Sequence, residues 1–295
     1  MSLVKSYATG NGDMFYIKHG SDNFTVIDCS IPSDREGSIL SEIATQSKKK
    51  GIHRFISTHP DQDHLSGLCE LDDHWSIVNF YVVKNATTKS SPTQDFKRYC
   101  KLRDGDKAFN LYRGCSRKWM NESDDERGSA GLQCLWPVIS NPYYKAALDD
   151  AAVGKTPNNI SIILKYAVEN GASMIWMGDL ETSFMEKIQD EITLPNVDVL
   201  FAPHHGRDSG RVPRKWLGEM DPGLIVIGEA PSQHLNYYSG YHTMTQNSCG
   251  DILLDCDGDK IHIYVEDSAY QVDFLDDEGK DHEHGLYYVG SFQCG

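Results

Sequence analysis

Short apolar runs alternate with polar, glycine-containing stretches along most of the chain, and this spacing predicts short strands interleaved with helices. Residues 14–18 and 24–28 are apolar runs on either side of a polar turn, which is the pattern of a β-hairpin. Residues 34–50 have an acidic residue early and three lysines late, which favours a helix because these charges complement the helix dipole. Residues 54–58 and 76–83 predict two more strands.

The second half of the chain continues this mixture. Residues 160–166 and 173–177 predict a hairpin, followed by a helix that ends near residue 190. Residues 213–220 predict another helix. Further strands are predicted at residues 197–202, 223–228, 252–254, 261–265, 270–274 and 286–289. Paired strands between helices indicate two mixed β-sheets with helices outside, an α/β layered domain.

Residues 84–155 are the least regular part, because they are polar, basic and interrupted by Ser-Pro and glycine. They predict an insertion with one or two helices, in a chain whose residues 1–295 we expect to form a single domain. Within this insertion, residues 131–138 predict a strand that returns to the core.

The net charge of −15 is unevenly distributed. Residues 81–120 hold ten Lys and Arg against three Asp, whereas residues 251–285 hold twelve acidic residues against two lysines. An acidic chain is a poor non-specific ligand for nucleic acid. The basic segment could still collect an anionic substrate, and Lys84, Lys97 and Arg98 are the candidate contacts. The alternative is a solvated helix face.

Composition places the chain among ordinary globular proteins, with 39% hydrophobic and 24% charged residues. Its apolar runs are all shorter than a membrane helix, and the N-terminus lacks the apolar core of a signal peptide. The eight cysteines show no C-x-x-C spacing, which argues against a zinc ribbon or a redox pair. We therefore expect a cytoplasmic protein with no membrane partner.

Four potential metal ligands occur within six residues: His59, Asp61, Asp63 and His64. They follow the predicted strand at residues 54–58 and precede a predicted helix, so a tight turn could aim them at one point. Imidazole and carboxylate ligands suit a divalent ion. A polar turn in which Asp61 or Asp63 caps the helix is the alternative, but a cap needs only one such residue.

Three further strand ends carry the same kinds of side chain. Asp28 follows one predicted strand, and Asp179 follows another, with Gly178 permitting a close backbone approach. His204 and His205 follow a third. Open α/β sheets gather their active sites at such strand ends, so the repetition predicts one shared metal site.

These residues, in this order and spacing, resemble the metallo-β-lactamase superfamily, and most closely the soluble metallo-β-lactamase-like domain of ComEC-type competence proteins. That subgroup has Asp at the position of Asp61 and an Asn-x-Ser element, here Asn159 to Ser161. The match extends from about residue 10 to 265. The chain departs from the family by placing Arg207 and Asp208 between His-His-Gly and Ser209. The resemblance implies an αββα sandwich of two mixed β-sheets with outer helices.

The resemblance also implies a site for two divalent metal ions, Zn²⁺ or Mn²⁺, the oxygen-rich set around Asp61 favouring manganese. His59 and Asp61 would hold one ion and Asp63, His64 and His204 the other, with His204 preferred to His205. Asp179 would bridge the ions and, with Asp63, is the expected catalytic residue. The residues expected to support the ligands are Asp28, His205, Asn159 and Ser161.

Hydrolysis of a phosphodiester by a metal-bound hydroxide is the leading prediction, because two ions can activate water without a protein nucleophile. The substrate could be DNA, RNA, a cyclic nucleotide or a small phosphodiester, and the oligomeric state is left open. One alternative is hydrolysis of a β-lactam, thioester or lactone, and another is a non-catalytic regulatory module that retains the fold.

Several weaker patterns occur towards the C-terminus. His234 and His242 flank an aromatic run, and His242 is a candidate substrate contact or part of a structural loop. Residues 282–284 read His-Glu-His, which in an acidic tail indicates a solvated loop more than a metal site. Residues 255–259 superficially match a calcium loop, but Asp-Gly between two strand patterns favours a hairpin.

Overall fold

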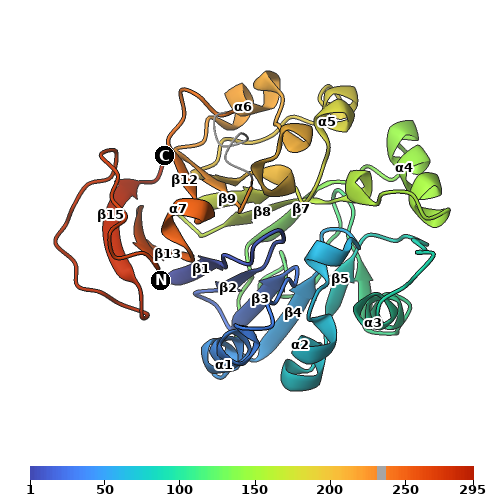
Figure 1. Cartoon of the computed structure of the whole chain (residues 1–295), viewed down its shortest axis with the longest axis horizontal. Coiled ribbons are helices and arrows are strands. Elements are labelled where there is room, and N and C mark those ends of the chain that lie inside the picture. The colour runs from blue at the N-terminus through green and yellow to red at the C-terminus, as the bar shows by residue number, and fades with distance from the viewer. Residues whose placement is uncertain (231–236) are drawn as a thin grey trace.

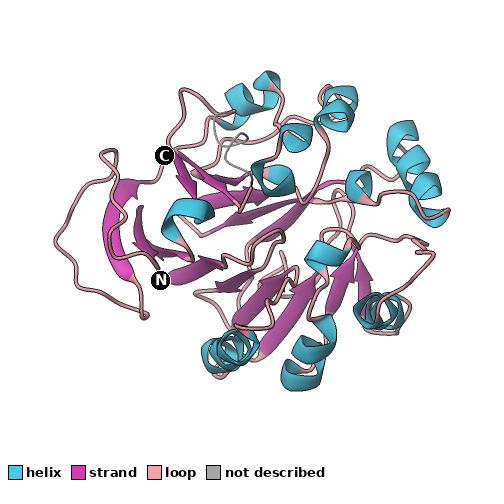
Figure 2. Cartoon of the chain, viewed as in Figure 1, coloured by secondary structure: helices cyan, strands magenta, loops and turns pink. Residues whose placement is uncertain are grey.

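The computed structural model describes residues 1–230 and 237–295, and its strands form two sheets packed face to face between outer helices (Figure 1, Figure 2). The first sheet has the strand order β15-β14-β13-β1-β2-β3-β4-β5-β6. These strands are β1 Ser2–Ser6, β2 Phe15–Lys18, β3 Asn23–Ile27, β4 Ile52–Ile56, β5 Phe80–Val82, β6 Ala108–Asn110, β13 Ile252–Asp257, β14 Lys260–Val265 and β15 Tyr287–Gln293.

The second sheet has the order β12-β11-β10-β9-β8-β7. Its strands are β7 Leu132–Trp136, β8 Ile163–Ala167, β9 Ser173–Trp176, β10 Val199–Phe201, β11 Leu224–Ile227 and β12 Thr243–Thr245. Both sheets are mixed, because β3 to β6 and β9 to β12 run parallel while β1, β2, β7 and β8 pair antiparallel with their neighbours. The α/β fold of two mixed sheets with outer helices agrees with the prediction.

The helices cover the outer faces of both sheets (Figure 1). Those below the first sheet in this view are α1 Glu36–Ser47, α2 Leu68–Trp75 and α3 Gln94–Arg103. Those above the second sheet are α4 Pro142–Ala152, α5 Thr182–Ile188 and α6 Arg214–Met220, and the short α7 Gln246–Cys249 lies near β1. Within the parts of the chain described, none of these helices is long and apolar enough to cross a bilayer.

Alternate side chains of the first sheet serve two cores. Phe15 and Ile17 of β2 face the second sheet, where the ring of Phe15 lies 5.9 Å from Trp176 and 5.0 Å from Phe201, between ring centres. Tyr16, between them in sequence, belongs to the other core, which includes residues of α1, α2 and α3. Because successive residues of a strand point to opposite faces, one face of the first sheet packs on the second sheet and the other packs on the helices.

The topology brings the predicted metal ligands to neighbouring strand ends. Asp28 follows β3 and the 59–64 motif follows β4, and these two strands are parallel, so both segments leave the same edge of the first sheet. Asp179 follows β9 and His204 follows β10, which are parallel in the second sheet. The two edges face each other across the sandwich.

Residues 84–155 contain the helices and the returning strand predicted for them, as α3, α4 and β7, and they add a short edge strand that was not predicted, β6. One prediction about the strands was wrong. Residues 270–274 are not a strand: Tyr270 and Phe274 pack against the core, while β15 occupies the place beside β14. The predicted hairpin at residues 255–259 is present as β13–β14.

Candidate metal centre

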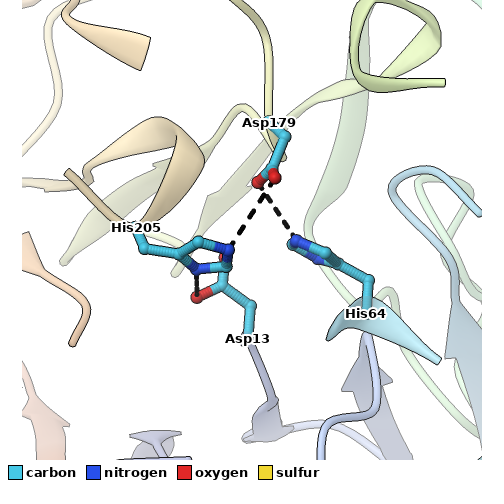
Figure 3. A group of neighbouring side chains, drawn as sticks. All are labelled: Asp13, His64, Asp179 and His205. Atoms are coloured by element: carbon cyan, nitrogen blue, oxygen red, sulfur yellow. Dashed lines mark hydrogen bonds and ion pairs between the residues drawn. The ribbon is translucent and has the colours of Figure 1, made fainter. Parts of the chain in front are cut away.

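Asp179 lies at the centre of a ring of four histidines. It follows β9 directly and is 2% exposed. Its Oδ1 atom lies 3.1 Å from Nε2 of His64, in a geometry that is not a hydrogen bond. Its Oδ2 atom lies 3.7 Å from the Nε2 atoms of His59, His204 and His205. Figure 3 shows Asp179 above His64 and His205, with Asp13 beside His205.

Two of these histidines are oriented by buried or half-buried carboxylates. His64 Nδ1 lies 2.8 Å from Asp28 Oδ2, and Asp28 also accepts hydrogen bonds from the backbone and hydroxyl of Thr58. His205 Nδ1 lies 3.0 Å from Asp13 Oδ1. A carboxylate that accepts from Nδ1 leaves the Nε2 lone pair free, which is the arrangement that orients histidine ligands in metal sites.

The other two histidines are held by hydroxyl groups. His59 Nδ1 lies 3.1 Å from the Thr58 hydroxyl, and His204 Nδ1 lies 2.9 Å from the hydroxyl of Ser209. Ser209 therefore reaches His204 even though Arg207 and Asp208 displace it along the sequence. All four imidazoles thus have Nδ1 anchored and Nε2 turned towards the Asp179 carboxylate.

The inward-facing atoms fit a cation. Within residues 1–230 and 237–295, Asp179 Oδ1 and the Nε2 atoms of His59, His64 and His205 are buried without a hydrogen-bond partner. Leaving such groups unpaired costs free energy, so a cluster of them in one place indicates a missing ligand. Imidazole nitrogen with carboxylate oxygen is the donor set of zinc, and carboxylates also suit manganese. One compact ligand group consists of Asp13, His64, Asp179 and His205, whose ligand atoms lie within 4.8 Å of one another.

The charges of the cluster are strongly coupled. Burial alone would raise the pKa of Asp179, but His64 and His205 outweigh it and hold this pKa well below its usual range. Burial would lower the pKa of His64, but Asp179 and Asp28 raise it well above the usual value. Burial and the charge of His64 lower the pKa of His59 to about 4. The Asp179 carboxylate is therefore ionised, as a metal ligand must be.

The backbone around Asp179 is fixed by the residues predicted to support it. Ser161 accepts a hydrogen bond from the Asp179 backbone N–H at 3.1 Å. Asn159 accepts from the backbone of Glu181 and donates to its carboxylate. Gly178 has φ +50°, and a Cβ there would lie 2.8 Å from the Ser161 hydroxyl and 3.0 Å from the Cβ of Thr58. This close approach explains the glycine before Asp179.

Asp61 and Asp63 lie at the more open side of the cluster. Asp63 Oδ2 is 3.5 Å from His205 Nε2, and although burial raises the pKa of this carboxyl, the adjacent His205 imidazole and the charge of His64 lower it to about 2. Asp61 instead caps the turn at Gln62 and forms an ion pair with Lys89, Oδ1 to Nζ 2.8 Å. The capping alternative thus holds for Asp61 itself.

The geometry does not support the preference for His204 over His205. Both Nε2 atoms are equally far from Asp179 Oδ2, but only the His205 side chain is fully buried, and it alone belongs to the compact ligand group. Sequence reasoning also missed Asp13. The sequence nevertheless contains a signal for Asp13. This residue precedes β2, and β2 is antiparallel to β3, so Asp13 lies at the same edge of the sheet as Asp28, which follows β3.

The candidate substrate contacts lie in different surroundings. Lys84 lines a cavity of about 580 Å³ with Tyr112, Tyr144 and Leu148, whereas Lys97 is exposed on α3. Arg98 is engaged by two carboxylates, those of Asp72 and Asp73. The ring of His242 stacks on Phe274. His234 lies outside the described residues.

Comparisons with known proteins give one family-model match. Residues 8–104, which include the motif at residues 59–64, match the family model of the metallo-beta-lactamase superfamily. No curated protein sequence matches the chain.

Among solved structures, Igni18, a metallo hydrolase from Ignicoccus hospitalis, matches with 14% identity and a TM-score of 0.47, over 86% of this chain and 99% of that one. A metallo-beta-lactamase mutant from Cronobacter sakazakii matches with 14% identity and a TM-score of 0.40, over 69% and 77%. BJP-1, a subclass B3 metallo-beta-lactamase of Bradyrhizobium japonicum, matches with 13% identity and a TM-score of 0.35, over 66% and 75%. Similarities at this level carry no information about the substrate.

Proposed function

We propose that this protein is a metal-dependent hydrolase of phosphodiesters, with two divalent ions, Zn²⁺ or Mn²⁺, held around Asp179. The observation that carries the proposal is the ring of four imidazoles with anchored Nδ1 atoms and Nε2 atoms facing one ionised carboxylate. A ring of this kind offers metal ligands and no activated side-chain nucleophile, which favours attack by water.

The contacts support a division of the ligands between two ions that share Asp179. His64, His205 and Asp63 would hold one ion, because the Asp63 carboxylate lies beside His205 Nε2. His59 and Asp61 would hold the other, and His204 completes the ring. When bound, the ions would polarise the phosphoryl oxygens and lower the pKa of coordinated water.

Two cations near the ring support an anionic substrate. Lys89 lies against Asp61. Arg207 donates to Asn11 at 2.6 Å and contributes, after burial and His205, to the lowered pKa of His204. A phosphodiester bound at the ring would have its non-bridging oxygens near positive charge, which stabilises the additional negative charge of the transition state.

The test is an activity panel on protein stripped of metal and reloaded with Mn²⁺ or Zn²⁺. Substrates are bis(p-nitrophenyl) phosphate, single- and double-stranded DNA, RNA, a cyclic nucleotide and a β-lactam. We expect metal-dependent turnover of one or more phosphodiesters and about two equivalents of metal in the ring.

Asp179→Asn should lose metal from the ring and activity together, because the shared carboxylate is neutralised. The matched control is Asp190→Asn, an exposed carboxylate that pairs with Lys215, which should leave both unchanged. Turnover of the β-lactam alone would overturn the proposed substrate class, and unchanged metal content in Asp179→Asn would overturn the shared-ligand assignment.

A further inference from the structure

A second group of potential ligands lies in the C-terminal part of the chain and shares no residue with the ring around Asp179. It consists of Asp255 on β13 and of Glu283 and His284, in the long segment that connects β14 to β15. One ligand atom from each lies within 4.8 Å of the others, and His284 Nε2 is 3.7 Å from Glu283 Oε2. In Figure 1 the connecting segment extends along the flank of the first sheet beside β15.

The Asp255 side chain is what distinguishes this group from an ordinary acidic surface. Asp255 is only 3% exposed, and its Oδ1 atom has no hydrogen-bond partner in the part of the chain that the structure describes. A buried carboxylate without a donor is costly, because it has lost its hydration without compensation. Its oxygen lies within reach of Glu283 and His284, which the chain brings in from a distant segment.

Among the described residues, three more polar atoms around Asp255 are buried without a hydrogen-bond partner. One is Nδ1 of His262, which pairs with Asp255 in the β13–β14 register and lies 4.0 Å from Glu278 Oε2. The others are the hydroxyl groups of Tyr264 and Tyr288, which face each other across β14 and β15. Such a concentration of unsatisfied groups on one face of a sheet indicates a ligand that interacts with them.

The charges at this place favour a cation. Burial raises the pKa of Asp255, against the opposing effects of His284, His262 and Lys280. Burial, followed by the charges of Glu283 and Asp255, raises the pKa of Tyr264 to about 12. The buried carboxylate of Asp255 and the exposed carboxylate of Glu283 place negative charge where the sheet meets the connecting segment, and a divalent ion would compensate it.

We propose that Asp255, Glu283 and His284 bind one divalent transition-metal ion of the zinc class, and that this ion fastens the segment before β15 onto the sheet. Two carboxylate oxygens and one imidazole nitrogen form a donor set that zinc accepts, whereas calcium takes oxygen ligands. His262 or a water molecule would complete the coordination. The role is structural, because the ion would add a link between a strand and a loop that is also held by the Lys260–Glu278 ion pair and by backbone hydrogen bonds between Asp276 and Ser291.

The test uses the full chain, stripped of metal and titrated with Zn²⁺ or, as a spectroscopic probe, Co²⁺. The variant is His284→Ala, and the control is His282→Ala, an exposed histidine whose ring contacts Tyr287. We expect His284→Ala to bind one equivalent of Zn²⁺ fewer than wild type. It should also lose part of the zinc-dependent rise in Tm and the zinc-dependent protection of residues 266–286 from proteolysis.

The readout does not depend on activity, so it separates this site from the ring around Asp179. If the ring binds no metal, the difference of one equivalent between wild type and His284→Ala should persist. Equal stoichiometry, Tm shift and proteolysis in wild type and His284→Ala would overturn the proposal. Stabilisation by Ca²⁺ but not by Zn²⁺ would overturn the assignment to the zinc class. Glu283→Gln provides an independent variant and should behave as His284→Ala does.

Discussion

Asp13 holds the ring of His205 in place: its Oδ1 atom lies 3.0 Å from His205 Nδ1, although 192 residues separate the two. The carboxylate accepts a hydrogen bond from Nδ1–H and so leaves Nε2 facing Asp179 and Asp63. Asp28 does the same for His64. The centre therefore contains two carboxylate–histidine pairs, one within the first sheet's segments and one that joins the two sheets.

Replacement of Asp13 tests this positioning role. Asp13→Ala should weaken metal binding by about 10- to 100-fold, because the His205 ring loses its fixed tautomer and orientation. Asp13→Asn, which keeps an oxygen acceptor, should lose less. Competition with a chromophoric chelator measures the affinity, and Asp34→Ala, an exposed carboxylate, is the control. Equal affinities for wild type and Asp13→Ala would show that His205 is oriented without Asp13.

The glycine before Asp179 gives a second prediction. Gly178→Ala should destabilise the fold by about 2–4 kcal/mol, since its φ of +50° is strained for alanine and the new Cβ would press against Ser161 and Thr58. The same displacement should reduce the metal content, because Asp179 is the next residue. The matched control is Gly218→Ala, at an exposed helical position with nothing within 4 Å, where alanine should stabilise by about 0.5–1 kcal/mol. Urea unfolding measures both, and equal stabilities would contradict the argument.

A pH-dependent contribution to stability is expected from Asp251. It is buried at the start of β13 and pairs with Arg35 at 2.7 Å and with Lys5 at 3.2 Å. Burial raises its pKa, but the hydrogen bonds from Arg35 and the charge of Lys5 outweigh burial and lower it. Because the folded-state pKa is depressed, the stabilisation is complete above the unfolded value of about 3.9 and is lost as the pH falls through the folded value.

Asp251→Asn should therefore cost roughly 3 kcal/mol at pH 7, where a buried pair is broken, and progressively less below about pH 4. Urea unfolding of both proteins between pH 3 and pH 7 measures this difference. A cost that stays constant over that range would assign the effect to packing and not to charge.

Much of the fold and of the metal centre could be predicted because both depend on local patterns. Apolar runs mark the strands, and polar side chains placed just after them, such as Asp28, Asp179 and His204, converge because parallel strands end at one edge. Asp13 was missed because it precedes its strand. The antiparallel pairing of β2 with β3, which the predicted hairpin already implies, takes Asp13 to the same edge.

Other differences also arise from long-range packing. The strand β1 carries Lys5, a buried residue that looks like a surface position in sequence but pairs with Glu42 and Asp251. Residues 282–284 suggested a solvated loop, because nothing nearby in sequence shows that buried Asp255 lies within ligand distance. Such pairings cannot be read from a local pattern.

The last prediction concerns Lys89, the cation beside Asp61. In the proposed hydrolase, Lys89→Ala should raise KM for an anionic phosphodiester about tenfold, as expected for the loss of one charge-assisted contact, and should leave the metal content unchanged. With single-stranded DNA, the slope of log K against log salt should fall by about one. Lys49→Ala, an exposed lysine that follows α1, is the control, and Lys97→Ala tests whether α3 contributes as well. If metal content and kcat fall while KM stays constant, Lys89 does not bind the substrate. Lys89 would then be a residue that positions Asp61.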